Sequence, residues 1–160
     1  MPDQSPTLDS ARRAAIVRNL QYGGSDVDTS HDMYAEDAVL EFPQSGERFV
    51  GRETFKEWRS RYPAKVEYRL RRITGNGDVW VNELLVSYNG GPWSFGVAVV
   101  VFRGEEIVRE SIYVMDGWDA AEWRAPWATR FDPLAGISPA DWREGEPFGL
   151  DAEAAEVVAR

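Results

Sequence analysis

The protein has 160 residues, enough for one domain with a hydrophobic core of its own. Its formal net charge of −9 argues against a nucleic-acid partner, because binding a row of phosphates requires clustered cationic side chains. The absence of cysteine excludes disulfides and thiolate chemistry, and with His31 as the single histidine we expect neither a metal site nor a cofactor.

No segment predicts a membrane span or an export signal. The apolar runs fall short of the roughly 18 residues that indicate a transmembrane helix. The N-terminal residues Met1–Ser5 lack the basic start and apolar core of a signal peptide. We therefore expect a cytoplasmic protein with no membrane partner.

The N-terminal residues predict one long helix. Ser5 and Pro6 have the pattern of an N-cap followed by proline at the first helical position. An apolar stripe then continues to about Tyr22, and the pair at residues 23–24 is Gly-Gly, which ends the helix.

The next segment predicts short elements. A short helix carries His31 and ends in an acidic stretch that starts at Tyr34, and a strand follows at 38–42. After a turn and a second short strand, a helix begins after Gly51. Its apolar face is formed by residues at i, i+3 and i+7, and these are Phe55, Trp58 and Tyr62.

From Lys65 onward the hydrophobic period changes to two, which indicates strands. Val66, Tyr68 and Leu70 alternate with charged residues. Glycine-containing turns then separate longer apolar runs at 79–89, 93–102 and 107–115. This pattern predicts an antiparallel meander.

The predicted meander is apolar on both faces. On the face that we expect to point away from the interior, the apolar residues are Trp80, Leu84, Val86, Trp93, Phe95, Val97 and Val99. An antiparallel sheet that is apolar on both faces is usually covered on both, and the chain has no second helix layer for this purpose. We therefore expect a homodimer through the outer face of the sheet.

The remainder of the chain predicts a short helix and a tail. Residues 119–127 form the short helix, and the sequence past Phe131 is rich in proline, glycine and acidic residues. We expect the domain to span residues 1–128. An extended acidic C-terminal tail follows at 129–160, with a candidate terminal helix at 151–158.

Two segments, Tyr34–Gly51 and Ile107–Trp127, carry a family resemblance. With the order of the elements, they resemble the nuclear transport factor 2-like superfamily and, within it, the SnoaL-like group named for a polyketide cyclase. The resemblance covers residues 8–128. It implies an α+β fold in which a cone-shaped, curved antiparallel sheet wraps around the N-terminal helices, a cystatin-like α+β barrel with a cavity for a small apolar ligand.

The known chemistries of this superfamily do not transfer residue by residue. By the resemblance, the base of ketosteroid isomerases falls at Phe42 and their oxyanion donor at Ala98. The Arg and Asp of limonene-type epoxide hydrolases fall at Glu83 and Leu85. Their second Asp and the cyclase Asp both fall at Ile112. None of these constellations is present, and the fold itself serves many reactions.

Candidate catalytic residues follow if those family positions face inward. Alternation along the strands then also turns Glu83 and Glu110 inward, among apolar neighbours. Desolvation raises the pKa of a carboxyl group toward neutrality, where it can accept or donate a proton. We therefore select Glu110 and Glu83 as candidate catalytic residues.

The candidate substrate-binding residues are aromatic and aliphatic. Tyr34 and Tyr68 offer phenolic donors to a developing oxyanion. Trp118, together with Trp123 and Trp127, is positioned to close the wide end of the cone. The apolar walls are Leu40, Phe42 and Ile112.

Each candidate has a structural alternative. Glu83 and Glu110 can pair with Arg72 or another arginine of the sheet. Tyr34 can be a core residue, and the tryptophans can serve packing alone. We expect His31, near a helix start, to be exposed.

Three functions remain open. The first is a small cofactor-independent lyase, isomerase or cyclase that acts on an apolar, carbonyl-bearing or polyketide-like molecule. The second is a non-catalytic module that binds a small molecule. The third is a dimeric scaffold whose cone is filled by its own side chains.

Overall fold

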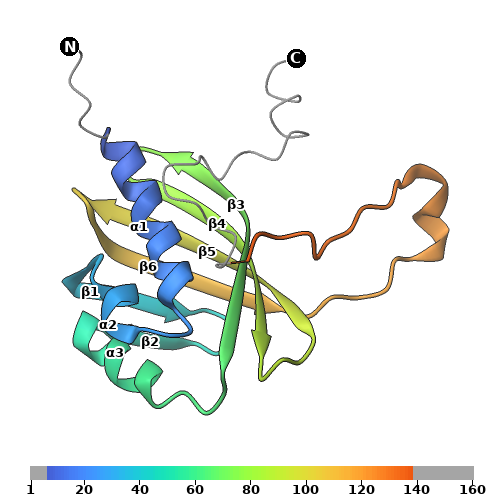
Figure 1. Cartoon of the computed structure of the whole chain (residues 1–160). Coiled ribbons are helices and arrows are strands. Elements are labelled where there is room, and N and C mark those ends of the chain that lie inside the picture. Colours follow the sequence, from blue (N-terminus) through green and yellow to red (C-terminus); the bar gives the residue numbers. More distant parts are fainter. Residues whose placement is uncertain (1–6, 139–160) are drawn as a thin grey trace.

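The computed structural model describes residues 7–138. In this range the helices are α1 (Leu8–Tyr22), α2 (Val27–His31), α3 (Arg52–Ser60) and the 3₁₀ helix η1 (Glu122–Trp127). The strands are β1 (Tyr34–Phe42), β2 (Glu47–Val50), β3 (Val66–Asn76), β4 (Val79–Tyr88), β5 (Trp93–Arg103) and β6 (Glu106–Met115). They form one sheet in the order β2-β1-β6-β5-β4-β3 (Figure 1).

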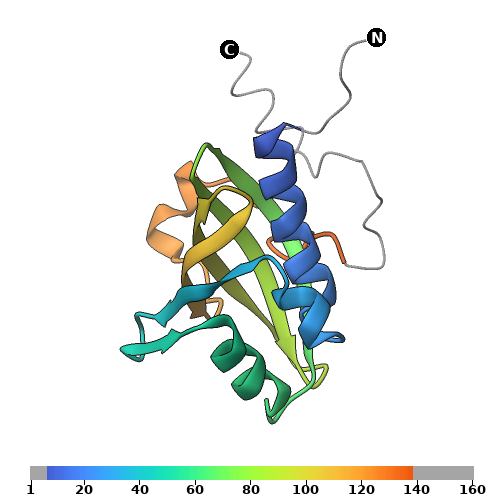
Figure 2. The same cartoon turned by 90° about the vertical axis from the view of Figure 1, so that its left-hand side faces the viewer.

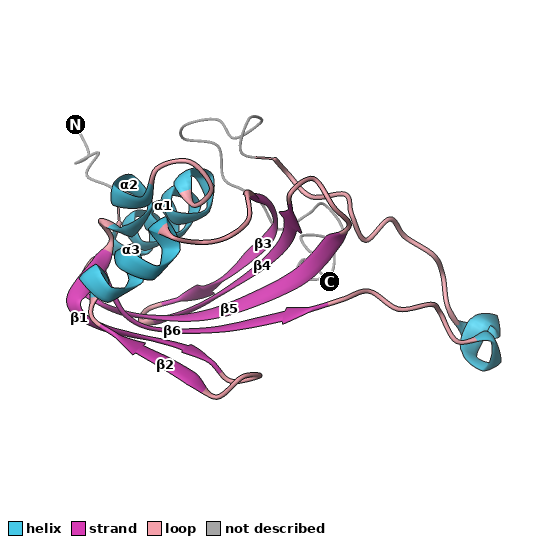
Figure 3. Ribbon diagram, turned by 90° about the horizontal axis from the view of Figure 1, so that it is seen from below, coloured by secondary structure: helices cyan, strands magenta, loops and turns pink. Residues whose placement is uncertain are grey.

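The fold is α+β, as expected, with a curved sheet against the N-terminal helices. The sheet stays open between its edge strands β2 and β3 rather than closing into a barrel. All three α-helices lie on its concave side (Figures 2 and 3). There α1 contacts β3, and α3 contacts β1 and β2. No helix within residues 7–138 is long and apolar enough to cross a membrane.

Side-chain caps define where the first two helices begin. The hydroxyl oxygen of Thr7 accepts a hydrogen bond from the backbone N–H of Ser10 at 3.2 Å, and Asp26 accepts one from Thr29 at 3.0 Å. Each cap satisfies a first-turn donor that has no partner inside the helix. The end of α1 at Tyr22 is confirmed, whereas the predicted start at residues 5–6 lies outside the described residues.

Strand β1 begins at Tyr34, not at residue 38 as predicted. Its pairing with β6 shifts register between Tyr34 and Val39, and the acidic residues Glu36 and Asp37 in this irregular stretch are exposed. Such a bulge hides the two-residue alternation that identifies a strand in sequence. The β1–β6 pairing is also parallel, so the sheet is mixed rather than wholly antiparallel.

The predicted meander is confirmed as β3 to β6, but the assignment of faces on β4 was wrong. Asn82 pairs with Ala98, which in turn pairs with Ile112, so these side chains share the inner face. Glu83, the neighbour of Asn82, therefore points outward. Trp80, Leu84 and Val86, expected outside, are buried in the core, while the β5 residues Trp93, Phe95, Val97 and Val99 are outward as expected.

After β6 the chain runs away from the sheet, forms η1 and returns to the edge of β3 (Figure 1). Leu70 and Ile137 exchange both backbone hydrogen bonds there, at 2.9 and 2.8 Å. The predicted helix at 119–127 is thus a shorter 3₁₀ helix at 122–127. The predicted terminal helix at 151–158 lies outside the described residues.

The hydrophobic core fills the space between the helices and the inner face of the sheet. It combines residues of α1 and α3 with residues from every strand except β2. The largest of its fully buried side chains are Ile16, Tyr34, Leu40, Phe55, Leu70, Val100 and Ile107.

Candidate functional site

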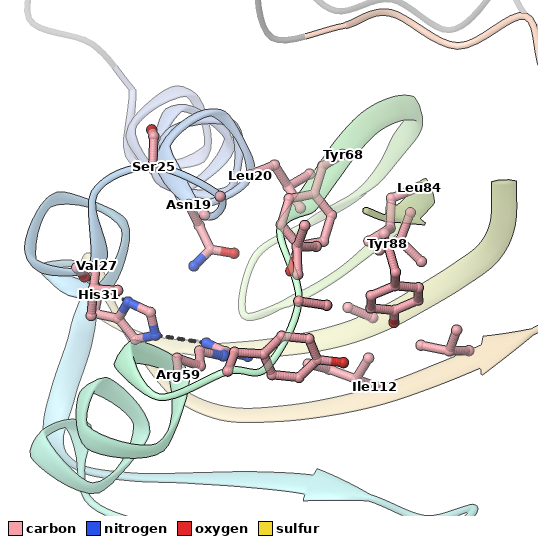
Figure 4. Close-up of a pocket in the computed structure, with 18 of the residues that line it drawn as sticks. Asn19, Leu20, Ser25, Val27, His31, Arg59, Tyr68, Leu84, Tyr88 and Ile112 are labelled. Atoms are coloured by element: carbon pink, nitrogen blue, oxygen red, sulfur yellow. Dashed lines mark hydrogen bonds between the residues drawn. The ribbon is translucent and has the colours of Figure 1, made fainter. Parts of the chain in front are cut away.

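A cavity of about 280 Å³ opens between α1, α3 and the inner face of the sheet (Figure 4). Phe42, Ala98 and Ile112 line it, so the inward orientation implied by the resemblance is confirmed. Its volume is close to the lower end of the roughly 300–1,000 Å³ of small-molecule sites. The scaffold hypothesis required an interior filled by its own side chains, and this cavity argues against it. Further apolar walls are Leu20, Trp58, Val66, Leu84, Val86 and Val114.

Glu110 of β6 is the buried acid of this cavity. Its side chain lines the cavity and the residue is 5% exposed. The hydroxyl of Tyr34 donates a hydrogen bond to its Oε2 atom at 2.7 Å. Burial raises the pKa of Glu110, and the positive charge of Arg59 and the Tyr34 hydrogen bond oppose that rise. Glu110 therefore combines a desolvated carboxyl group with two groups that favour its ionised form.

The two oxygens of Glu110 are not equivalent. Tyr34 occupies Oε2, whereas Oε1 has no hydrogen-bond partner among residues 7–138. Glu110 lines the cavity, so Oε1 is the carboxyl oxygen that no residue among 7–138 occupies there.

Arg59 of α3 and His31 of α2 form the polar end of the cavity and were not selected from the sequence. Arg59 Nη1 donates to His31 Nε2 at 2.7 Å (Figure 4). Because an arginine only donates, Nε2 must accept, and the ring proton sits on Nδ1, 2.7 Å from the carbonyl oxygen of Val27. Burial and the charge of Arg59 lower the pKa of His31 to about 4, so the ring is neutral at pH 7.

His31 is 2% exposed, which corrects the expectation of an exposed residue. A single histidine in a short polar helix carries no burial signal in sequence. The position of Arg59 could have been predicted from the sequence. It follows Phe55 by four residues and therefore shares the inward face of its helix.

Tyr34 and Leu40 were predicted to contact the ligand, but neither lines the cavity. Leu40 is fully buried core, paired beside Glu110 in the β1–β6 register. Tyr34 is also fully buried, with its ring packed edge-to-face on Phe55 at 5.2 Å between centroids. Its hydroxyl lies behind the carboxyl group of Glu110 and donates a hydrogen bond to it.

The structure places Tyr68 in the cavity wall, as predicted, and adds Tyr88 and Asn82. Burial raises the pKa of Tyr68, and it raises the pKa of Tyr88 to about 12. Both phenols therefore keep their protons at neutral pH and can donate hydrogen bonds. Asn82 Oδ1 and Trp58 Nε1 are buried without a hydrogen-bond partner in the described part of the chain, so the wall also holds unsatisfied polar atoms.

Two predicted site residues lie elsewhere. Glu83 is on the outer face, with Oε2 3.3 Å from Nε of Arg72, and does not line the cavity. The cause is the β4 register, which turns Asn82 inward in its place. Trp118 lies beyond β6 and is 79% exposed, so it does not close the cone.

Residues 17–110 match the profile of the SnoaL-like domain. The chain belongs to the SnoaL-like family. Among curated proteins, none matches this chain in sequence.

Solved structures agree with the SnoaL-like assignment. The chain is similar to an NTF-2 like protein of unknown function from Burkholderia xenovorans LB400, with 35% identity over 76% of this chain and 96% of that one, and a TM-score of 0.72. A proposed ketosteroid isomerase from Kribbella flavida is 17% identical over 82% of this chain and 98% of that one, with a TM-score of 0.71. An LEH-like epoxide hydrolase from M. tuberculosis is 18% identical over 68% of this chain and 85% of that one, with a TM-score of 0.60. The last two similarities show a shared fold only.

Proposed function

We propose that this SnoaL-like protein is a small cofactor-independent enzyme of the isomerase, lyase or cyclase type. It moves a proton on an apolar, carbonyl-bearing or polyketide-like ligand held in the cavity, and Glu110 is the acid and base. The observation that carries the proposal is the carboxyl group of Glu110, which is 5% exposed, accepts a hydrogen bond from Tyr34 at Oε2 and lines the cavity with no partner at Oε1 among residues 7–138. A carboxyl group at such a place costs stability, which favours a functional reason for it.

The proposed step balances without another reactant. Oε1 of ionised Glu110 removes a proton from the carbon beside the ligand carbonyl, so that the C–H bond breaks and an O–H bond forms. The electron pair moves onto the carbonyl oxygen as an enolate, which accepts a hydrogen bond from the phenol of Tyr68 or Tyr88. Return of the proton to a different carbon gives an isomerisation. Loss of a leaving group or attack on a second carbonyl from the same enolate gives a lyase or a cyclase.

Proton exchange tests this step before the natural substrate is identified. The probe is a panel of small apolar ketones led by 2-tetralone, incubated in D₂O and followed by loss of the α-proton NMR signals. We expect the wild type to accelerate exchange and Glu110→Gln to lower the rate by about 100-fold or more.

The matched control is Glu83→Gln, a glutamate of the same sheet that points outward. It is expected to keep the wild-type exchange rate. Exchange that survives in Glu110→Gln, or a wild type that exchanges no ketone of the panel, contradicts the proposed chemistry.

A non-catalytic ligand-binding module is the second candidate. It is favoured by the apolar side chains of Phe42, Ala98 and Ile112 at positions where the resemblance implies acids in active relatives. In that case the same ketones bind to wild type and Glu110→Gln alike, as measured by saturation-transfer NMR, and their α-protons do not exchange.

We also propose a homodimer through the outer face of the sheet. Support comes from the half-buried β5 side chains Trp93, Phe95, Val97 and Val99, and from Tyr113 beside them on β6, which is 37% exposed. A contiguous apolar surface on an antiparallel sheet is typical of a protein interface.

A further inference from the structure

Residues 116–131, called the arm below, form a loop that projects beyond the sheet and carries η1 (Figures 1 and 3). It carries three exposed tryptophans, Trp118 at 79%, Trp123 at 75% and Trp127 at 81%, and an exposed phenylalanine, Phe131 at 70%. None of the three tryptophans makes a ring–ring or cation–π contact within residues 7–138. So many large exposed rings in one segment indicate a binding surface rather than ordinary solvent exposure.

Both ends of the arm rest on the outer face of the sheet. A Cβ atom added at Gly117 would lie 3.2 Å from the ring of Phe95, and one added at Gly136, just past the arm, would lie 3.2 Å from Cδ1 of Leu85. Phe95 and Leu85 are register partners on β5 and β4 and point outward. The arm therefore starts and ends beside the apolar face that we propose as the dimer interface.

Ordering the arm costs conformational entropy, which stabilising contacts must offset. Fixing a backbone costs about 1–2 kcal/mol of conformational entropy per residue. Phe131 at the end of the arm lies under the guanidinium of Arg71, whereas Trp118, Trp123 and Trp127 stay exposed. Burial of these tryptophans on another molecule would offset the cost.

We propose that the arm clasps a second copy of this chain. In a two-fold dimer packed outer face to outer face, each arm reaches past the interface and buries its tryptophans on the partner. This inference rests on the homodimer proposed above and is independent of the chemistry of Glu110.

The size of the arm fits this role. Residues 116–121 contain no helix or strand and can reach up to roughly 20 Å, at about 3.3 Å per residue, which exceeds the roughly 10 Å between two packed sheets. Aromatic side chains bury roughly 150–250 Å² each, so the exposed rings of two arms contribute on the order of 1,000 Å². A specific interface needs about 1,200–2,000 Å², and the two sheet faces supply the rest.

Charge argues against a membrane as the occupant. The arm carries the acidic residues Asp116, Asp119 and Glu122 against the basic residues Arg124 and Arg130, and the whole chain has a formal charge of −9. Anionic lipid surfaces attract cationic segments and repel acidic ones. A second copy, by contrast, presents the apolar outer face itself.

Sedimentation of the full chain over a concentration series tests the clasp. We expect a wild-type dimer, and a rise of at least 100-fold in the dimer dissociation constant when Trp118→Ser, Trp123→Ser and Trp127→Ser are combined. Val50→Ser is the matched control, because Val50 is an apolar residue of β2 that is 60% exposed and away from the arm. Circular dichroism verifies folding, and the single variant Trp123→Ser provides the same test with less change.

The sedimentation results distinguish the dimer proposal from the clasp proposal. A wild type that stays monomeric at 100 μM overturns both the dimer and the clasp. A wild-type dimer whose dissociation constant is unchanged in the triple and the single variant overturns the clasp alone. A blue shift of wild-type tryptophan emission on phosphatidylcholine–phosphatidylglycerol vesicles, absent from the triple variant, would make a membrane the occupant and also overturn it. Neither ketone exchange nor ketone binding enters any of these results.

Discussion

Glu110 places stability and chemistry in opposition at a single residue. Burial raises the pKa of its folded-state carboxyl group above the ordinary value of 4.5. Between the ordinary pKa of the unfolded state and the raised pKa of the folded state, the folded protein binds more protons. Stability therefore falls as pH rises through this interval. At neutral pH the ionised carboxyl group in the cavity therefore destabilises the folded protein. Catalytic groups often have this effect.

This conflict predicts the behaviour of Glu110→Gln. The amide carries no charge to desolvate and still accepts the hydrogen bond of Tyr34. We expect the stability of the variant relative to wild type to increase between pH 4 and pH 8, measured by urea denaturation at both pH values. A stability difference that is the same at both would contradict the assigned environment of the carboxyl group.

His31 predicts the opposite pH dependence. Its pKa is lowered from 6.5 unfolded to about 4 folded, so the unfolded state binds more protons and stability is lost as pH falls from about 6.5 through about 4. The full loss is roughly 3 kcal/mol, at about 1.4 kcal/mol per pKa unit. His31→Gln keeps an acceptor for Arg59 without this titration.

The measurement is the slope of unfolding free energy against pH between 4 and 6.5. We expect a smaller slope in His31→Gln than in wild type, and since His31 is the single histidine, no other imidazole contributes. Equal slopes would mean that His31 is not held neutral by burial and Arg59.

The inward orientation of Glu110 could be predicted because strand alternation, counted from the family positions, places its side chain on the same face as Ile112. The same prediction failed for Glu83 because β4 is apolar on both faces, with Leu84 buried on one and Leu85 on the other. Periodicity alone then does not show which face of β4 points inward, and a register shift of one residue moves every side chain to the opposite face.

At the scale of elements, the chain just after α1 lies tightly against β3 beside the cavity. A Cβ atom added at Gly24 would lie 2.2 Å from the carbonyl oxygen of Val66, and both residues line the cavity. Since that neighbour is backbone, it has no rotamer through which to move away.

We therefore expect Gly24→Ala to force the α1–α2 connection away from β3 and to destabilise the protein by about 1–3 kcal/mol. Urea midpoints measure the loss, and the exposed neighbour variant Ser25→Ala is the control, expected to remain close to wild type. Gly24→Ala with wild-type stability would show that this contact is looser than described.

Elements were predicted well where turns are marked by glycine and less well where geometry is irregular. The β-meander was recovered within a residue or two because tight turns separate uniform apolar runs. The start of β1 was missed because its bulge exposes Glu36 and Asp37 in the middle of a strand. The i, i+4 spacing of Trp123 and Trp127 predicted a helix at 119–127, and the structure has a shorter 3₁₀ helix there with both tryptophans exposed.

At the scale of the whole molecule, the outer face and the arm together predict the assembly. Val99 lies on β5 between Val81 and Ser111, in the middle of the outer face. We expect Val99→Glu to place like charges opposite each other in a face-to-face dimer and to shift it toward monomer, as measured by light scattering. Val50→Glu on the edge strand β2 is the control and should remain dimeric.

The proposed chemistry depends on the ionisation of one carboxyl group inside the cavity. A ¹³C NMR pH titration of the glutamate carboxyl carbons measures it directly, with the resonance of Glu110 identified by its loss in Glu110→Gln. We predict a pKa above 4.5 for Glu110 and a shift of its resonance when 2-tetralone is added. A pKa at or below 4.5, with no response to the ketone, would contradict the account.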